Sequence, residues 1–265
     1  MSGNQSLERG LAILELLDRA PAPIGIRAIG RELGLSPTIV QRLASTLAQA
    51  GFLEQDRETR RYKLGYRAMT LGSALAGEDR LLATAGEELQ HLADQFQLNA
   101  YLGALRDNRV IYLKTVQSSG PIVVRAAVGS RANAHSTALG KALLAPLDQA
   151  EIEALLGPAP YSRLTPATIT DWPALLAELQ MVRRRGFAIA REENIVGVVS
   201  FGALVRDSAN DPVAALSVAC LASQHPEAEW PELIQLVLDA AHRCSQALGY
   251  QGAALVFSGV SGHAA

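Results

Sequence analysis

The sequence has few cysteines and no long apolar run. Its two cysteines, Cys220 and Cys244, lie far apart in 265 residues and form no C-x-x-C motif. This favours two buried free thiols in a reducing cytosol over a disulfide scaffold or a thiolate metal site. No apolar stretch approaches the roughly 18 residues that cross a bilayer, and the N-terminus lacks the features of a secretory signal. We therefore expect a cytoplasmic protein with no membrane partner.

The sequence also lacks the short motifs of common catalytic and cofactor sites. G-x-S-x-G, G-x-G-x-x-G and H-E-x-x-H do not occur. Gly140-Lys141 has neither the upstream glycine nor the following Ser or Thr of a phosphate-binding loop, so we interpret Lys141 as structural. His135 and Ser136 are adjacent, but no third member of a triad is apparent. We expect no catalytic residue, no metal and no cofactor.

Composition and charge indicate what the chain does contain. With 49% hydrophobic and 19% charged residues, it can build a real core in one large domain or two. Residues 1–75 hold ten Arg and Lys against seven Asp and Glu, whereas the remaining residues hold fourteen against nineteen. A basic first quarter joined to an acidic remainder suggests a nucleic-acid-binding module attached to another domain.

The first quarter predicts a helix-turn-helix. Leu7, Leu11, Leu14 and Leu17 have helical spacing over residues 7–19, and Pro21 ends that helix. A second helix over residues 26–33 stops at Gly34, the residue that most easily takes the left-handed conformation beyond a helix. Ser36 is a good N-cap and Pro37 a good first residue for a third helix to about residue 50.

The third helix has one apolar and one polar face. Val40, Leu43, Ala44 and Leu47 fall on one side and are predicted core. The opposite side carries only residues that form hydrogen bonds, as a recognition helix in the major groove requires: Thr38, Gln41, Arg42, Ser45 and Gln49. An ordinary solvated face remains the alternative from this helix alone.

A basic hairpin is predicted directly after these helices. Residues 52–55 and 61–64 read as short strands around a turn, whose tip carries Arg57, Arg60 and Arg61. Such a wing can reach phosphates or the minor groove beside the recognition helix. We therefore favour DNA binding over a protein-interaction module.

Beyond residue 66 the pattern changes twice. Residues 66–96 read as mostly helical with a break near Gly77, which is typical of a linker. Strands are then predicted at 100–105, 110–116, 122–128, 198–205 and 213–221, and helices at 137–145, 151–156, 171–185 and 231–248. This makes an α+β second domain. Arg183, Arg184 and Arg185 end one helix, where we prefer a role in complementing its dipole to a second nucleic-acid patch.

The late strands predict a pocket on one sheet face. Val199, Phe201, Ala203 and Val205 point one way and are wholly apolar, whereas Ser200 and Gly202 point the other way. Ser217 lies among the small residues of the next strand in the same manner. Small residues with single hydroxyls leave room for a ligand. The alternative is that both serines bond to backbone in a packed core.

Over residues 7–248 the chain resembles the IclR-type bacterial transcriptional regulators. The matching stretches are Arg9-Gly10-Leu11-Ala12-Ile13-Leu14, Gly34-Leu35-Ser36, Gln41-Arg42-Leu43, Tyr62-Lys63-Leu64-Gly65, Val128-Gly129-Ser130-Arg131, His135-Ser136-Thr137-Ala138-Leu139-Gly140-Lys141-Ala142-Leu143-Leu144, Thr168-Ile169-Thr170, Arg185-Gly186-Phe187-Ala188 and Glu192-Glu193. Their order and spacing make the resemblance specific. The chain departs from many relatives at Ala190, Arg191 and residues 198–200, beside the family's ligand pocket, so a relative's ligand does not transfer.

The resemblance implies an α+β architecture. It consists of a winged helix-turn-helix (1–66), linker helices (67–98), a GAF-like effector-binding domain with an antiparallel sheet (99–250) and a flexible tail (251–265). It implies a homodimer or homotetramer that binds double-stranded operator DNA and a small-molecule effector, commonly a carboxylate or aromatic acid. The candidate DNA-binding residues are Arg27, Ser36, Thr38, Gln41, Arg42, Ser45, Arg57, Arg60 and Arg61. The candidate effector-binding residues are Val124, Ala138, Leu139, Gly140, Ala190, Val198, Ser200, Ser217 and Ala219.

We interpret the chain as a sequence-specific transcriptional regulator of a catabolic operon, with repression as the favoured mode. The first alternative is an enzyme that turns over a small acid and carries a vestigial DNA-binding domain. The second is an adaptor that uses the winged domain as a scaffold. The absent catalytic motifs argue against the enzyme.

Overall fold

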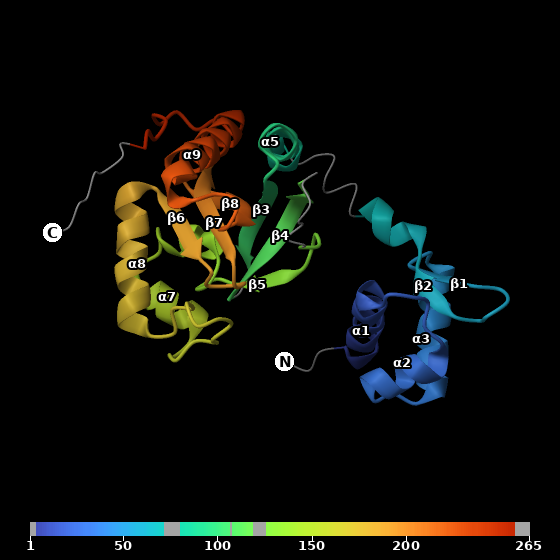
Figure 1. The fold of residues 1–265 in the computed structure, drawn as a ribbon. Helices are drawn as coiled ribbons and strands as arrows, with labels where there is room; N and C mark the ends of the chain where they lie inside the picture. The colour runs from blue at the N-terminus through green and yellow to red at the C-terminus, as the bar shows by residue number, and fades with distance from the viewer. Residues whose placement is uncertain (1–3, 72–79, 107, 119–125, 258–265) are drawn as a thin grey trace. The chain divides into compact units, whose positions relative to one another are not determined.

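The computed structural model describes residues 4–71, 80–106, 108–118 and 126–257 (Figure 1). The chain divides into two compact units, Met1–Asp79 and Arg80–Ala265. Each unit is described by itself below. Within the described residues, no helix is long and apolar enough to cross a membrane.

The N-terminal unit is a winged helix-turn-helix. It contains α1 (Gln5–Arg19), α2 (Ile26–Leu33), α3 (Pro37–Gln49), and an antiparallel hairpin of β1 (Leu53–Gln55) and β2 (Tyr62–Leu64). The predicted end of α2 and the predicted N-cap of α3 are confirmed. Gly34 takes the left-handed conformation after α2 (φ 65°), and Ser36 Oγ accepts a hydrogen bond from the Ile39 amide. Residues 66–71, after the wing, are helical.

The three helices and the hairpin enclose a small core. Its fully buried residues are Ile13, Leu17, Ile29, Val40, Ala44, Leu53 and Tyr62. The predicted α3 core is confirmed, with Leu43 and Leu47 packed at its margin. On α1 the inward face is formed by Ile13 and Leu17, whereas Leu7 and Leu11 are 61% and 51% exposed. The regular leucine spacing therefore predicts the helix but not which of its leucines face the core.

The C-terminal unit is built on one six-stranded antiparallel sheet of order β5-β4-β3-β8-β7-β6. The strands are β3 (Asn99–Arg106), β4 (Arg109–Val116), β5 (Arg131–Asn133), β6 (Phe187–Arg191), β7 (Val198–Arg206) and β8 (Pro212–Leu221). The helices are α5 (Arg80–Phe96), α6 (Ala138–Leu144), α7 (Gln149–Leu156), α8 (Trp172–Arg185) and α9 (Trp230–Ala247), with a short 3₁₀ turn η1 (Glu227–Glu229) before α9.

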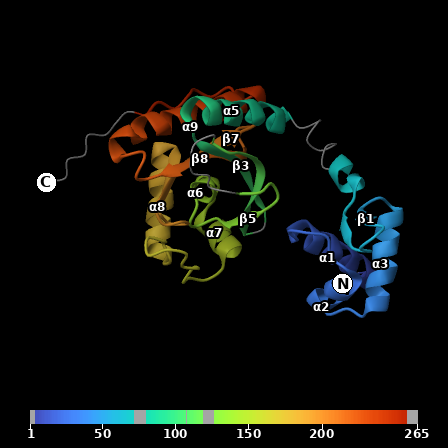
Figure 2. The same cartoon turned by 45° about the vertical axis from the view of Figure 1, so that its right-hand side comes forward.

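Helices cover both faces of this sheet. Helices α5 and α9 pack on one face, and α6 and α8 lie on the other (Figure 2). The predicted alternation is confirmed in β7, because Val199 and Phe201 face the α5/α9 layer while Val198 faces the α6 layer. The sheet therefore has one tightly packed side and one side on which small residues lie beneath a short helix.

Three features of this unit differ from expectation. The predicted strand 122–128 is not found where it is described: residues 126–128 form coil and turn, and 122–125 lie outside the described residues. The outer neighbour of β4 is the unexpected strand β5. Strand β6 was not expected either, because its first four residues, Phe187-Ala188-Ile189-Ala190, are all apolar and show no alternation of apolar and polar residues. Helix α5, assigned to a linker from sequence, buries Leu81, Ala85 and Leu89 in the core of the C-terminal unit.

Both cysteines lie in this core, and Phe257 packs against it. Cys220 and Cys244 are buried free thiols, as expected, and burial raises the pKa of each to about 12. Residues 251–257, expected to be flexible, are held in place: Gln235 accepts a hydrogen bond from the Phe257 amide at 2.8 Å, and the Phe257 ring lies edge-on to Phe187.

Candidate nucleic-acid interface and ligand pocket

Helix α3 presents the predicted polar face to solvent. Thr38, Gln41 and Arg42 are exposed and Ser45 is half-buried. Gln41 Nε2 lies 3.2 Å from Ser45 Oγ and 3.4 Å from the Tyr62 hydroxyl, so this amide is held against both its own helix and the hairpin. Both contacts use the Gln41 amide nitrogen, and within the described residues its carbonyl oxygen remains available to accept a hydrogen bond, which suits readout of a base edge.

The wing loop is shaped by one carboxylate. Asp56 Oδ1 accepts hydrogen bonds from the Glu58 amide, the Thr59 amide and the Thr59 hydroxyl at 3.1, 2.7 and 2.7 Å. These bonds, those of Thr59 above all, lower the pKa of Asp56. Arg60 takes a positive φ of 57° in the same turn. The loop thus holds Arg57, Arg60 and Arg61 on an exposed tip.

A hollow of about 870 Å³ lies between α2, α3 and the wing. Arg27, Gln41, Arg60 and Arg61 from the predicted set line it, and so does Arg31, which sequence analysis did not name. Arg31 follows Arg27 by one helical turn, and this spacing was the available signal. None of the described residues that line the hollow is an Asp or Glu. Such a concave cationic surface attracts phosphates.

The C-terminal unit contains a pocket of about 370 Å³ on the α6 side of the sheet. Seven of the nine predicted effector-binding residues line it: Ala138, Leu139, Ala190, Val198, Ser200, Ser217 and Ala219. Val124 lies outside the described residues. Gly140 does not line the pocket, because it packs on the backbone of Ala134, where an added Cβ would lie 2.1 Å from the carbonyl oxygen.

Two arginines at this pocket were not anticipated. Arg109 begins β4 and is paired across the sheet with Asn133, and Arg131 begins β5. Within the described part of the chain, neither guanidinium group forms an ion pair with a carboxylate. The pocket is therefore more cationic than its late strands alone indicate, and it can hold an acid by charge as well as by hydroxyl hydrogen bonds.

A pair of tyrosines forms another part of the lining. The rings of Tyr101 on β3 and Tyr112 on β4 lie 5.5 Å apart at 59°, and burial raises the pKa of both hydroxyls. A β-bulge brings them to the same side of the sheet, because the register shifts between Leu102 and Gly103 so that Gly103 lies opposite Tyr112. A bulge changes which residues share a face, and this is why the alternation in sequence did not reveal the pair.

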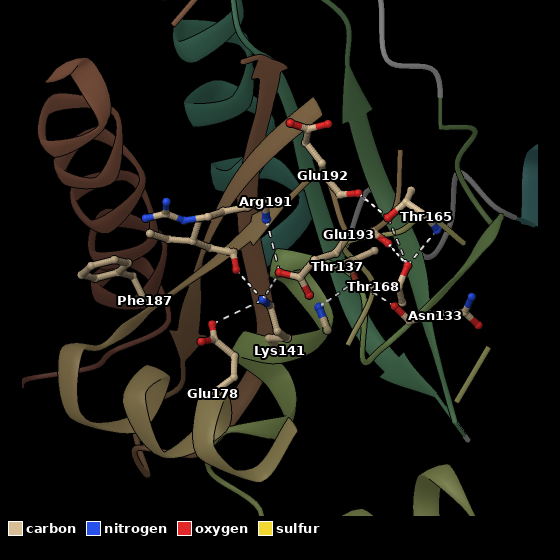
Figure 3. A network of polar contacts seen from close by, with 12 residues as sticks. Asn133, Thr137, Lys141, Thr165, Thr168, Glu178, Phe187, Arg191, Glu192 and Glu193 are labelled. Carbon is tan, nitrogen blue, oxygen red and sulfur yellow. Dashed lines mark hydrogen bonds and ion pairs between the residues drawn. The ribbon is translucent and has the colours of Figure 1, made fainter. Parts of the chain in front are cut away.

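A buried ion network joins α6, α8 and the loop that follows β6 (Figure 3). Lys141 of α6 is fully buried and its Nζ contacts Glu193 Oε1 at 2.6 Å, Glu178 Oε1 at 3.3 Å and the Ile189 carbonyl oxygen. Burial raises the pKa of Glu193, although the Lys141 charge opposes this. Glu178 also pairs with Arg185 at 2.9 Å. The predicted structural role of Lys141 agrees with these contacts.

The same network fixes the loop that follows β6. Thr165 Oγ1 donates to the Glu192 carbonyl and Thr168 Oγ1 donates to the Glu193 carbonyl, each at 2.6 Å (Figure 3). The next residue, Asn194, lines the ligand pocket. The ion pair between Lys141 and Glu193 therefore links α6 to the loop that follows β6. Both of these elements contribute residues to the pocket wall, Leu139 from α6 and Asn194 from the loop.

Comparison with known proteins identifies the family. A model described as the bacterial transcriptional regulator IclR C-terminal domain matches residues 74–246, and the IclR helix-turn-helix domain matches residues 6–57. The chain belongs to the IclR family of bacterial transcriptional regulators. The expected winged helix-turn-helix and the α+β domain with an antiparallel sheet are thereby confirmed.

The curated relatives are regulators rather than enzymes. The HTH-type transcriptional regulator XynR of Escherichia coli K12 is 31% identical over 93% of this chain and 98% of its own. The HTH-type transcriptional repressor AllR of Salmonella paratyphi A is 30% identical over 93% and 91%. The chain is accordingly a transcriptional regulator, and the alternative interpretation as a small-acid-metabolising enzyme is set aside.

Solved structures share the fold. A transcriptional regulator from Rhodococcus sp. RHA1 superposes with a TM-score of 0.83 at 26% identity and covers 93% of this chain and 99% of its own. An IclR homologue from Microbacterium hydrocarbonoxydans, solved in complex with 4-hydroxybenzoate, gives a TM-score of 0.81 at 23% identity, covering 92% and 99%.

Proposed function

We propose that this regulator occupies an operator through the α3 face and the wing, and releases it when a small carboxylic acid enters the C-terminal pocket. Repression is the proposed mode, in keeping with the relative named as a repressor. A bacterial regulator that binds chromosomal DNA acts in the cytoplasm, and we propose that location. The observation that carries the ligand class is the presence of Arg109 and Arg131 in the pocket without a carboxylate partner among the described residues.

The size and lining of the pocket restrict the acid further. About 370 Å³ accommodates a compact ligand. Ser200 and Ser217 supply hydroxyls from the sheet, while Tyr101, Tyr112 and Leu139 supply apolar and aromatic surface. A carboxylate on an apolar or aromatic body matches both halves of this lining. The Microbacterium homologue with 4-hydroxybenzoate supports this class, and that acid is the first probe we select.

The backbone amides at the start of α6 have a minor part in this proposal. Thr137 caps the helix, and its Oγ1 already accepts from the Gly140 amide at 3.1 Å. The two arginines therefore carry the main electrostatic attraction in this proposal. Ser200 and Ser217 orient the ligand by neutral hydrogen bonds.

The experiment is a binding screen of the full-length protein. A panel of small carboxylates that includes 4-hydroxybenzoate is tested for release of an operator duplex that the protein itself has selected from random DNA. We expect at least one acid to release the duplex from the wild type but not from an Arg109→Gln/Arg131→Gln variant. Arg163→Gln is the matched control, since Arg163 is exposed, does not line the pocket and bonds to Pro166 and Thr170. Equal release from the double variant would overturn the proposed site.

We also infer that the regulator works as a homodimer or homotetramer. One recognition helix reads only a few base pairs, so two-fold symmetry is needed for a useful site. Large apolar side chains are exposed on the N-terminal unit, with Leu7 at 61%, Tyr66 at 72% and Met69 at 56%. Exposed apolar side chains of this size are typical of an interface.

Light scattering tests this inference. We expect an even-numbered oligomer that binds a pseudo-palindromic operator, and a smaller species for a Leu7→Glu/Leu11→Glu variant. A wild-type monomer that saturates its operator at one protein per site would contradict the inference.

A further inference from the structure

A second cavity in the C-terminal unit has the same volume as the ligand pocket, about 370 Å³. It forms because β7 is longer than its edge neighbour β6. Phe187, the first residue of β6, pairs with Ala203, so the last residues of β7, up to Arg206, pair only with β8. The uncovered margin of the sheet lies between the ends of α6 and α8 on one side and α9 on the other.

Residues 250–255 form one wall of this cavity. Leu255 lies over Gly186, the residue that ends α8, and its carbonyl oxygen accepts from Gln235 Nε2 at 3.3 Å. Ala253 and Tyr250 of the same segment line the cavity. The wall is thus held by specific contacts from α9.

Three arginines make this cavity cationic. Arg183, Arg184 and Arg206 line it together with the polar side chains of Asn210, His242, Ser245 and Tyr250, and none of the described lining residues is an Asp or Glu. Arg183 donates to the carbonyls of Ala145 and Leu147 at 2.6 Å, and Arg206 donates to that of Asn210 at 2.8 Å. Carbonyl contacts orient a guanidinium group but do not neutralise its charge, and each group keeps further N–H donors.

Three other arginines of the same unit are neutralised by a carboxylate. Arg185 pairs with Glu178, Arg191 with Glu227, and Arg243 with Glu88. By contrast, no ion pair to Arg183, Arg184 or Arg206 occurs within the described portion of the chain. Unpaired positive charges gathered in one concavity repel each other, and a bound anion relieves that repulsion.

We propose that this second cavity is a binding site for a small organic carboxylate, separate from the ligand pocket. Its cationic side would hold the carboxylate, and its apolar side, formed by Val182, Leu204, Leu238 and Leu255, would cover the body of the molecule. Helix α6 and strand β7 contribute to both cavities, through Ala138 and Val198 at one end and Ala142 and Leu204 at the other. An anion in the second cavity therefore contacts the same two elements as the effector.

The probe is 4-bromobenzoate, soaked into crystals of the full-length protein and titrated against it by calorimetry. We expect anomalous bromine density in the second cavity and a binding event that an Arg184→Gln/Arg206→Gln variant weakens by about tenfold or more, as loss of charge-assisted hydrogen bonds requires. Arg109→Gln/Arg131→Gln is the matched control, because it alters only the ligand pocket and should leave this event unchanged. That control also separates this site from the proposed function.

Three outcomes would overturn the proposal. Bromine confined to the ligand pocket would show that the second cavity does not bind the acid. Equal occupancy by the neutral 4-bromobenzyl alcohol would show that the charges play no part. Density in the crystal without any effect of the Arg184→Gln/Arg206→Gln change in solution would mean binding at crystal concentration only.

Discussion

The proposed DNA-binding surface of the N-terminal unit comes from residues 27–61, whereas the ligand pocket draws on segments spread from Tyr101 to Ala219. The first surface is made of exposed side chains on consecutive short elements. The second is made mostly of buried and half-buried side chains that only the strand order β5-β4-β3-β8-β7-β6 brings together. Local sequence periodicity therefore specifies one surface directly and the other only through the fold.

The charged side chains of the two regions also differ in their exposure to solvent. The arginines of the wing are exposed, so water screens them until DNA replaces that water. Lys141 is buried, and its charge is tolerated only because Glu193 and Glu178 contact it. Substitutions should accordingly affect DNA affinity in the first region and stability in the second.

The largest expected effect is on Lys141. A Lys141→Met change leaves Glu193 buried without its cation, and Glu193 Oε2 already lacks a hydrogen-bond partner within the described residues. We expect the C-terminal unit to lose about 3–5 kcal/mol in free energy of unfolding. Urea denaturation measures this, with Lys63→Met as control, because Lys63 pairs with Glu54 at the surface and should cost less than about 1 kcal/mol. Equal losses would remove the contrast between the two regions.

The wing comes next. An Arg57→Ala/Arg60→Ala/Arg61→Ala protein should bind every DNA sequence more weakly. The slope of log affinity against log salt should fall by about 0.9 for each phosphate contact that is lost. Fluorescence anisotropy over a salt series measures the slope. Arg19→Ala is the control, because Arg19 is an exposed arginine of the same unit that pairs with Glu15. An unchanged slope in the triple variant would exclude the wing from the interface.

Arg42 on α3 should affect sequence preference instead of the salt slope. Replacing it by alanine removes a candidate base contact, and we expect discrimination at one position of the operator to fall by about 1–3 kcal/mol. Selection from random DNA before and after the change measures the preference. If the selected sequence remained the same while overall affinity fell, Arg42 would contact phosphate and not a base.

The smallest effects are expected in the ligand pocket. Ser200→Ala and Ser217→Ala should each weaken acid binding by about 0.5–1.5 kcal/mol, since each removes one neutral hydrogen bond. Calorimetry with the acid found in the screen measures the loss. Ser208→Ala is a suitable control, because Ser208 is exposed in the β7–β8 turn and does not line the pocket. Unaltered affinity in the double variant would favour the alternative that both serines only bond within a packed core.

Much of this architecture could be predicted from the sequence, for identifiable reasons. Gly34 and Ser36 mark the turn before α3, and the apolar face of β7 marks the sheet core. Sequence analysis also identified Ser200 and Ser217 at the pocket, because strand alternation is a local property. The same reasoning separated the polar face of α3 from its core face.

The missed features depend on contacts between distant segments. Arg109 reaches the pocket through pairing with β5, a three-residue strand too short to detect. Tyr112 shares a face with Tyr101 only through a bulge. The partners of Lys141 lie 37 and 52 residues further along the chain. The sequence contained the residues in each case but no signal for their pairing.

The central claim is that an acid in the C-terminal pocket controls DNA binding by the N-terminal unit. The most direct test measures operator affinity against acid concentration for the wild type and for the Arg109→Gln/Arg131→Gln variant, using fluorescence anisotropy of the selected duplex. The account predicts equal operator affinity for both proteins without acid, followed by release of the wild type alone as acid is added. Release of both proteins at the same acid concentration would contradict it.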